Sequence, residues 1–191
     1  LAPYTTLDIG GIAQYFTEPN TLQELQDTLV SAHQQQLKTY IIGGGSNIIV
    51  SDSPIKGLVI RYQAKTLRLH PAINGTVQID AEAGLPWDTL VATSVQHHLT
   101  GIECMSGIPG YCGAAPIQNI GAYGQELANT LISVQVIEKN PPFHTHTIPA
   151  SDCHFQYRSS RFKAEWQNHY IVTSISLRLF ANQTPILRYP Q

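Results

Sequence analysis

Two glycine-rich, nearly uncharged segments constrain this chain more than any other feature of its sequence. The first, 41–50, reads IIGGGSNIIV, and the second, 107–124, reads GIPGYCGAAPIQNIGAYG. Consecutive glycines let the backbone adopt conformations closed to other residues and approach a ligand closely. Successive N–H groups in such a turn can converge on an anion. The first segment therefore favours a phosphate group, although a tight turn between two strands would also explain one or two of its glycines.

The first segment lacks two common phosphate-binding motifs. No lysine follows the glycines as in a nucleotide-hydrolysing P-loop, and no G-x-G-x-x-G fingerprint enters a helix as in the doubly wound dinucleotide folds. The apolar run 48–50 instead predicts a strand, so the loop is expected to connect one strand to another. The second segment is too long and too apolar for an exposed linker. Together they suit a ligand with a diphosphate and a ring system, such as a flavin dinucleotide.

Hydrophobic periodicity predicts a small α/β unit followed by a strand-rich unit. A capping box at 21–24 and apolar residues at helical spacing predict a helix over 21–36. Pro86 is expected to start a second helix. The expected buried face of that helix carries Trp87, Leu90, Val91, Ser94 and Val95. Strands are expected over 39–42, 48–50, 58–60, 77–81, 131–138, 145–148 and 170–179, with a turn at 140–142.

Composition excludes several classes of protein. Hydrophobic residues make up 42% of the chain and charged residues 13%, which favours a packed globule over disorder. The net charge of -2 argues against a nucleic-acid or anionic-membrane partner. Three cysteines without a C-x-x-C motif are expected to be reduced thiols of a cytosolic protein. His144 and His146 are expected to lie on an exposed hairpin, and we predict no metal site.

Five stretches of the sequence resemble one known family. They are YTTLDIGG at 4–11, GGGSN at 43–47, IPG at 108–110, GAAPIQNIGAYGQEL at 113–127 and CHFQYRSSRFK at 153–163. They resemble bacterial UDP-N-acetylenolpyruvoylglucosamine reductase, the MurB family of peptidoglycan synthesis, over essentially the whole chain. The resemblance implies an α+β fold of the FAD-binding PCMH/vanillyl-alcohol-oxidase type, with the flavin between two α+β subdomains.

The resemblance also implies a domain organisation. Residues 1–62 would form an N-terminal α/β FAD-binding subdomain, and 63–191 a strand-rich second FAD-binding subdomain. The family has a third, substrate-binding domain, which supplies a serine that protonates the intermediate and a glutamate that assists it. We expect that domain to be absent from these 191 residues, so the chain is expected to be the FAD-binding fragment of an oxidoreductase and inactive alone.

The family's reaction sets the expected function. NADPH reduces FAD, and UDP-N-acetylglucosamine enolpyruvate is then reduced to UDP-N-acetylmuramate, a step of cell wall biogenesis that serves cell shape and cell division. The resemblance implies a cytoplasmic monomer that acts on a small UDP-sugar, without nucleic acid or membrane. Two alternatives remain open: another flavin oxidase of the same superfamily, or a non-catalytic flavin-binding module.

Site residues are carried over by position. Arg158 is expected to be catalytic, because a fixed guanidinium would stabilise the enolate-like charge built by hydride addition; a surface ion pair is the alternative. Tyr157 and Tyr189 are expected to contact the substrate, and Ser159 stands where the family has an aspartate. The residues expected to bind FAD are Gly43, Gly44, Gly45, Ser46, Asn47, Ile48, Ile108, Pro109, Gly110, Gly113, Ala114, Ala115, Pro116, Gln118, Asn119, Ile120, Gly121, Ala122 and Gly124.

Overall fold

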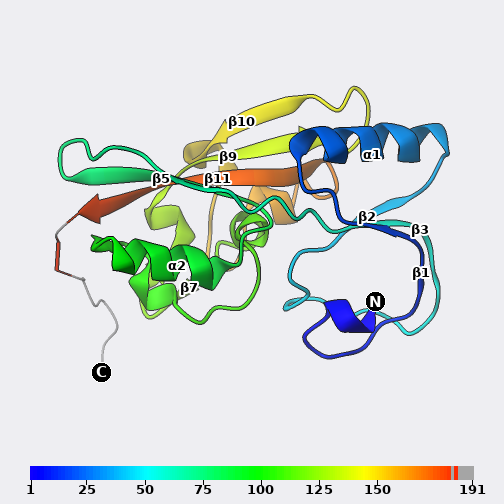
Figure 1. The fold of residues 1–191 in the computed structure, drawn as a ribbon, viewed down its shortest axis with the longest axis horizontal. Helices are drawn as coiled ribbons and strands as arrows, with labels where there is room; N and C mark the ends of the chain where they lie inside the picture. Colours follow the sequence, from blue (N-terminus) through cyan, green and yellow to red (C-terminus); the bar gives the residue numbers. More distant parts are fainter. Residues whose placement is uncertain (182, 185–191) are drawn as a thin grey trace.

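Two larger β-sheets lie beside each other in the described part of the chain (Figure 1), which also contains a two-stranded ribbon. The computed structural model describes residues 1–181 and 183–184. The first sheet is parallel and has the strand order β1-β3-β2. Its strands are β1 (Ala13–Thr17), β3 (Ile55–Ile60) and β2 (Thr39–Ile41). The strands predicted at 39–42 and 58–60 correspond to β2 and to part of β3, whereas β1 was not predicted.

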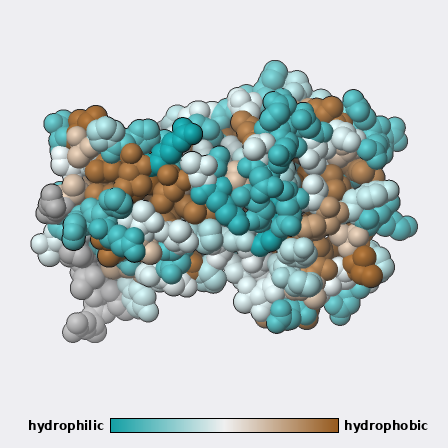
Figure 2. Space-filling model, viewed as in Figure 1, coloured by the Kyte–Doolittle hydropathy of each residue, from teal (hydrophilic) through white to brown (hydrophobic). Residues whose placement is uncertain are grey.

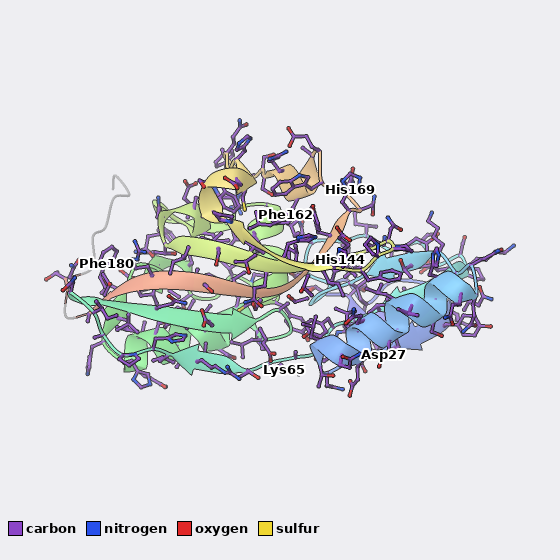
Figure 3. All side chains as sticks on the ribbon, turned by 90° about the horizontal axis from the view of Figure 1, so that it is seen from above. Asp27, Lys65, His144, Phe162, His169 and Phe180 are labelled. Carbon is purple, nitrogen blue, oxygen red and sulfur yellow. The ribbon has the colours of Figure 1, made fainter. Side chains whose placement is uncertain are left out.

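Helix α1 (Leu22–Gln34) confirms the helix predicted over 21–36. Its first turn is capped, because the backbone N–H of Glu24 donates to Thr21 Oγ1 at 3.1 Å and the N–H of Asn20 donates to Glu24 Oε2 at 2.7 Å. One face of the helix is buried, with Leu25 fully so. Figure 3 shows α1, which carries Asp27, at one end of the second sheet, and Phe180 at the other.

The second sheet is antiparallel and has the order β10-β9-β11-β5-β4, with β6 paired to β11. Its six strands are β4 (Leu67–Leu69), β5 (Thr76–Glu82), β6 (Leu99–Thr100), β9 (Leu131–Glu138), β10 (Thr145–Pro149) and β11 (Tyr170–Ala181). The four strands predicted over 77–81, 131–138, 145–148 and 170–179 are confirmed by these bounds. Alternation of apolar and polar residues indicated the strand at 77–81, and β5 indeed buries every second residue.

Helix α2 (Trp87–Gln96) lies below the second sheet in the view of Figure 1. Pro86 occupies its N-cap position, next to the expected start. Trp87, Leu90, Val91 and Ser94 are buried as predicted, but Val95 is 50% exposed. The prediction for Val95 was wrong because the stripe that packs on the sheet is narrow, and residue 95 lies a further 100° around the helix from Ser94.

Short elements connect the strands. A two-stranded ribbon pairs β7 (Gly121–Ala122) with β8 (Gln125–Glu126). The 3₁₀ turns are η1 (Ala2–Tyr4), η2 (Glu103–Met105), η3 (Cys112–Ile117), η4 (Leu127–Asn129), η5 (Ala150–Cys153) and η6 (Arg161–Lys163). The second glycine segment is therefore mostly irregular, as predicted, and its backbone is arranged in turns.

The predicted strand at 48–50 does not form. These residues have no regular structure, and Ile49 is 83% exposed. Their apolar side chains line a cavity instead of a sheet face. A short apolar run indicates burial, or a ligand, without specifying which. The glycine loop therefore does not lead directly into a strand; an irregular stretch separates it from β3, the parallel neighbour of β2.

Hydrophobic side chains from both sheets form one core. It includes Leu25 and Leu29 of α1, Ile60 of β3 and many residues of the second sheet. The face shown in Figure 2 is largely hydrophilic, with hydrophobic side chains gathered in patches on both halves. Within the described ranges, no helix is both long and apolar enough to cross a bilayer, and no three His, Cys, Asp or Glu side chains lie where they could share a metal ion.

The three thiols are expected to differ in reactivity. Burial raises the pKa of Cys112 to about 12 and that of Cys153 to about 12. Burial and the charge of Glu103 also raise the pKa of Cys104, but this side chain is only half-buried. Because the thiolate is the reactive form, iodoacetamide at pH 8 should modify Cys104 at least about tenfold faster than the other two. Mass spectrometry of timed samples measures this, with guanidinium-unfolded protein as the control. Equal rates at all three cysteines in the folded protein would contradict the burial described here.

Candidate cofactor-binding site

The two glycine segments meet at one cavity of about 1100 Å³. Residues 43–51, which lie between β2 and β3, line one side of it, and residues 109–111 and 113–115 of the second segment also line it. Parts of β2 and of β11 complete the walls. The cavity thus lies between the two sheets and takes its lining from both. Its volume is slightly above the range usual for small-molecule sites, about 300–1,000 Å³.

Direct contacts hold the two segments together. The hydroxyl of Ser46 donates to the carbonyl of Pro109 at 3.2 Å, and Asn47 Nδ2 donates to Gln118 Oε1 at 2.9 Å. A Cβ at Gly44 would lie 3.0 Å from the Cα of Gly110, closer than ordinary contacts allow. Glycine is therefore required at this point because the two backbones are in contact.

The first glycine loop begins where the parallel strand β2 ends. Gly45 has a φ of +73°, and a Cβ there would lie 2.0 Å from the carbonyl oxygen of Tyr4. The N–H of Thr6 donates to the carbonyl of Gly45 at 3.2 Å. The N-terminal turn therefore supports the loop from behind and leaves its other side facing the cavity.

Gly43 differs from its neighbours because its missing side chain leaves space on the cavity side. A Cβ there would have the Cβ of Ala114 as its nearest described neighbour, at 3.8 Å, and both residues line the cavity. The loop therefore presents backbone, without side chains, across the opening between the two segments. Such a surface lets backbone N–H groups reach an anion.

Most of the residues predicted to bind a cofactor line this cavity. Those that do are Gly43, Gly44, Gly45, Ser46, Asn47, Ile48, Pro109, Gly110, Gly113, Ala114, Ala115, Gln118 and Ile120. The described lining does not include Ile108, Pro116, Asn119, Gly121, Ala122 or Gly124. Contact of any predicted residue with a cofactor stays a prediction, but the structure separates the predicted residues that line the cavity from those outside its described lining.

Asn119, one of the predicted residues outside the described lining, has a structural role. Its side chain is buried, and its amide donates to Glu126 Oε2 at 3.0 Å and to the carbonyl of Gln156 at 3.2 Å. Its Oδ1 accepts the N–H of Ala128 at 3.0 Å. These bonds fix the second glycine segment to its neighbours, so the side chain of Asn119 is engaged within the protein.

Several residues that line the cavity were not predicted. They come from strands, helix α2 and connections outside the glycine segments and include Lys38, Tyr40, Tyr62, Trp87, Lys139, Phe162, Lys163 and Tyr170. Burial, with the charges of Glu82 and Glu24, raises the pKa of Tyr62 to about 12, so its phenol stays protonated at neutral pH. Burial lowers the pKa of Lys139, and the nearby charge of Lys38 adds to this effect.

Arg158 and Tyr157 lie on an exposed turn beside the second glycine segment. The N–H and carbonyl groups of Gln156 and Ser159 pair across this turn at 3.0 and 3.1 Å. Arg158 Nη2 donates to the carbonyl of Gly121 at 3.1 Å, and Tyr157 is 88% exposed. Neither residue is in the described lining of the cavity. Tyr189, also predicted to contact the substrate, lies outside the described residues.

The residues present fit a flavin dinucleotide. Such a cofactor needs a turn that can meet its diphosphate, which 43–47 provides, and flat apolar walls for its rings. Ala114, Ile117 and Ile120 supply apolar walls on the side of the second segment. Residues of both sheets line the cavity, as the binding of an extended ligand requires.

Comparisons with known proteins agree with this geometry. The sequence profile of the FAD binding domain family matches residues 13–141. The chain is 40% identical to the UDP-N-acetylenolpyruvoylglucosamine reductase of Salinispora arenicola, over 94% of this chain and 48% of that protein. The chain spans about half the length of the curated relatives it matches. The resemblance inferred from the motifs is thus confirmed.

Solved structures show the same fold. The crystal structure of UDP-N-acetylenolpyruvylglucosamine reductase (MurB) from Thermus caldophilus superposes with a TM-score of 0.74 at 28% identity, over 96% of this chain and 61% of that one. A solvent-stable cholesterol oxidase gives 0.67 at 13% identity, over 88% and 35%, and shows the fold alone. The chain therefore belongs to the FAD-binding domain family, with an α+β fold of the PCMH/vanillyl-alcohol-oxidase type.

Proposed function

We propose that this chain is the FAD-binding part of an NADPH-dependent UDP-N-acetylenolpyruvoylglucosamine reductase. The observation that carries the proposal is the single cavity at which the side-chain-poor loop 43–47 faces the second glycine segment. The similarity to reductases of that name along nearly the whole chain supports the same assignment. The reaction would reduce the enolpyruvyl double bond of a UDP-sugar, in the cytoplasm, with the protein acting as a monomer.

The residues of the first loop would hold the cofactor's diphosphate. Backbone N–H groups of Gly43, Gly44 and Gly45 would face it, and Ser46 and Asn47 keep the loop in place through their bonds to the second segment. The bound FAD would supply a ring that accepts and returns a hydride. The protonated phenol of Tyr62 could donate a hydrogen bond inside the cavity.

Arg158 would act on the substrate at the edge of the site. Its guanidinium is held by the carbonyl of Gly121, in the second segment, and remains exposed, so a substrate outside the cavity can reach it. A guanidinium stabilises the negative charge that develops on a carboxylate-bearing enol ether as it is reduced. Tyr157 and Tyr189 would contact the same substrate.

We also propose two subdomains, 1–62 and 63–191. Strands β1, β2 and β3 of the parallel sheet all fall in the first range, and all strands of the antiparallel sheet fall in the second. This division would make the cavity an interface between subdomains, where binding sites commonly occur.

Titration with FAD tests the proposed function. The purified protein should bind FAD with a micromolar or lower dissociation constant and become yellow, with the flavin fluorescence changing until one equivalent is bound. NADPH added without oxygen should then bleach the absorbance near 450 nm. A protein that takes up no FAD would refute the proposal. Bound FAD that supports oxygen consumption with an alcohol or amine, but is not reduced by NADPH, would indicate a flavin oxidase.

A further inference from the structure

Arg61 connects three parts of the fold behind the cavity. It follows β3, and its Nη1 donates to Glu18 Oε1 at 2.8 Å, next to the end of β1. Its Nη2 donates to the hydroxyl of Tyr111, in the second glycine segment. The guanidinium carbon lies 5.1 Å from the ring centre of Tyr4 and 5.3 Å from that of Tyr111, so it is also close to two aromatic rings.

Both aromatic residues that contact Arg61 lie against the first glycine loop. A Cβ at Gly44 would be 3.4 Å from Cδ1 of Tyr111, and a Cβ at Gly45 would be 2.0 Å from the carbonyl oxygen of Tyr4. Tyr4 is itself stacked on Phe16 of β1, with ring centres 4.5 Å apart. The guanidinium therefore links the two residues against which the glycine loop rests.

Tyr111 lines the cavity, whereas Arg61 is not in its described lining. A lysine could not replace Arg61 here, because its single ammonium group lacks the planar fork with which Arg61 bonds Glu18 and Tyr111 at once. Within the described residues, Nε of Arg61 has no hydrogen-bond partner although it is buried. A buried N–H group without a hydrogen-bond partner destabilises the folded state, so a gain in folding stability does not explain this arrangement.

From these contacts we infer that Arg61 and Tyr111 are positioning residues for the cofactor: together they fix the separation of the two glycine segments and so set the affinity for FAD. The inference rests on the proposed function. Hydrogen bonds from backbone N–H groups weaken steeply when their distance or angle changes, and a binding site needs supporting contacts that hold it within about 0.5 Å. Arg61 and Tyr111 supply such support at the point where Gly44 and Gly110 touch.

A double-mutant cycle tests the inference. Arg61→Gln and Tyr111→Phe should each raise the dissociation constant of FAD about tenfold, the factor expected for one hydrogen bond of this kind. The double variant should also lose about tenfold rather than a hundredfold, because both changes break the same contact. Arg61→Lys should not recover the wild-type affinity. Fluorescence titration at 25 °C measures the wild type and the four variants, and the melting temperature of each without FAD reports its folding.

Two matched variants serve as controls. Arg68→Gln, on β4, and Tyr15→Phe, on β1, remove the same chemical groups from exposed residues outside the described lining, and should leave the affinity unchanged. Additive losses, an unchanged affinity, or full recovery by Arg61→Lys would overturn the inference. If Arg61→Gln does not fold, two milder variants test the inference. Tyr111→Phe keeps the aromatic ring, and Arg61→Lys keeps the positive charge. Failure of the wild-type protein to bind FAD would instead refute the proposed function.

Discussion

A protein carrying Gly43→Val is expected to fold normally and to lose FAD. The backbone of Gly43 lies outside the left-handed region, and a Cβ there would meet only the Cβ of Ala114, at 3.8 Å, among the described atoms. A Cβ at residue 43 would therefore fit the apo fold, but the valine side chain would occupy the side of the loop at which the diphosphate is proposed to bind. We expect the dissociation constant of FAD to rise by at least about a hundredfold.

The measurement combines titration with unfolding. The free energy of unfolding without FAD should stay within about 1 kcal/mol of the wild-type value, because a Cβ at residue 43 meets only Ala114, at ordinary contact distance. Gly43→Ala should give an intermediate loss of affinity. Ala72→Val, which adds similar bulk at an exposed residue outside the described lining, should bind FAD normally. Retention of full affinity by Gly43→Val would show that the diphosphate does not lie against this loop.

Gly45→Ala is expected to destabilise the fold itself. Gly45 has a φ of +73°, and a Cβ there would lie 2.0 Å from the carbonyl oxygen of Tyr4 and 2.8 Å from the Cα of Thr5. Backbone atoms cannot move away as a flexible side chain could, so the loop and the N-terminal turn must separate. We expect the free energy of unfolding to fall by about 3–5 kcal/mol, or the melting temperature by about 10 °C.

Gly75→Ala is the matched control for this change. Gly75 has a nearly identical φ of +75°, but a Cβ there would meet no described atom within 4 Å. It therefore carries the same backbone strain without the clash, and should cost only about 1–2 kcal/mol. Chemical unfolding of both variants without FAD measures the difference. Equal losses at the two positions would show that strain alone, and not contact with the N-terminal turn, makes Gly45 necessary.

The sequence was most informative where one local rule decided the structure. The cap formed by Thr21 predicted α1, and the alternation over 77–81 predicted β5 to within one residue at each end. The sequence was misleading at 48–50, because an apolar run that lines a cavity has the same composition as a buried strand. Strand β1 was missed because its residues are partly exposed and do not alternate regularly.

The residues of the candidate site also differ in whether the sequence could identify them. Glycine loops could be identified because unusual backbone requirements leave a mark in a short stretch of sequence. Lys38, Lys139 and Tyr170 could not be, because nothing local distinguishes them from surface residues and only the pairing of distant strands brings them to the cavity. The bond between Arg61 and Tyr111 joins residues 50 positions apart, which no periodicity can reveal.

Strand β11 has a consequence for the order in which the protein can assemble. It is the last strand that the structure describes, yet it lies inside the second sheet, bonded to β5 on one side and to β9 and then β6 on the other. Tyr170, Ile171 and Val172 at its start also line the cavity. A nascent chain on the ribosome therefore has neither a joined sheet nor a finished pocket until this strand has emerged, and cofactor capture must follow translation of nearly the whole segment.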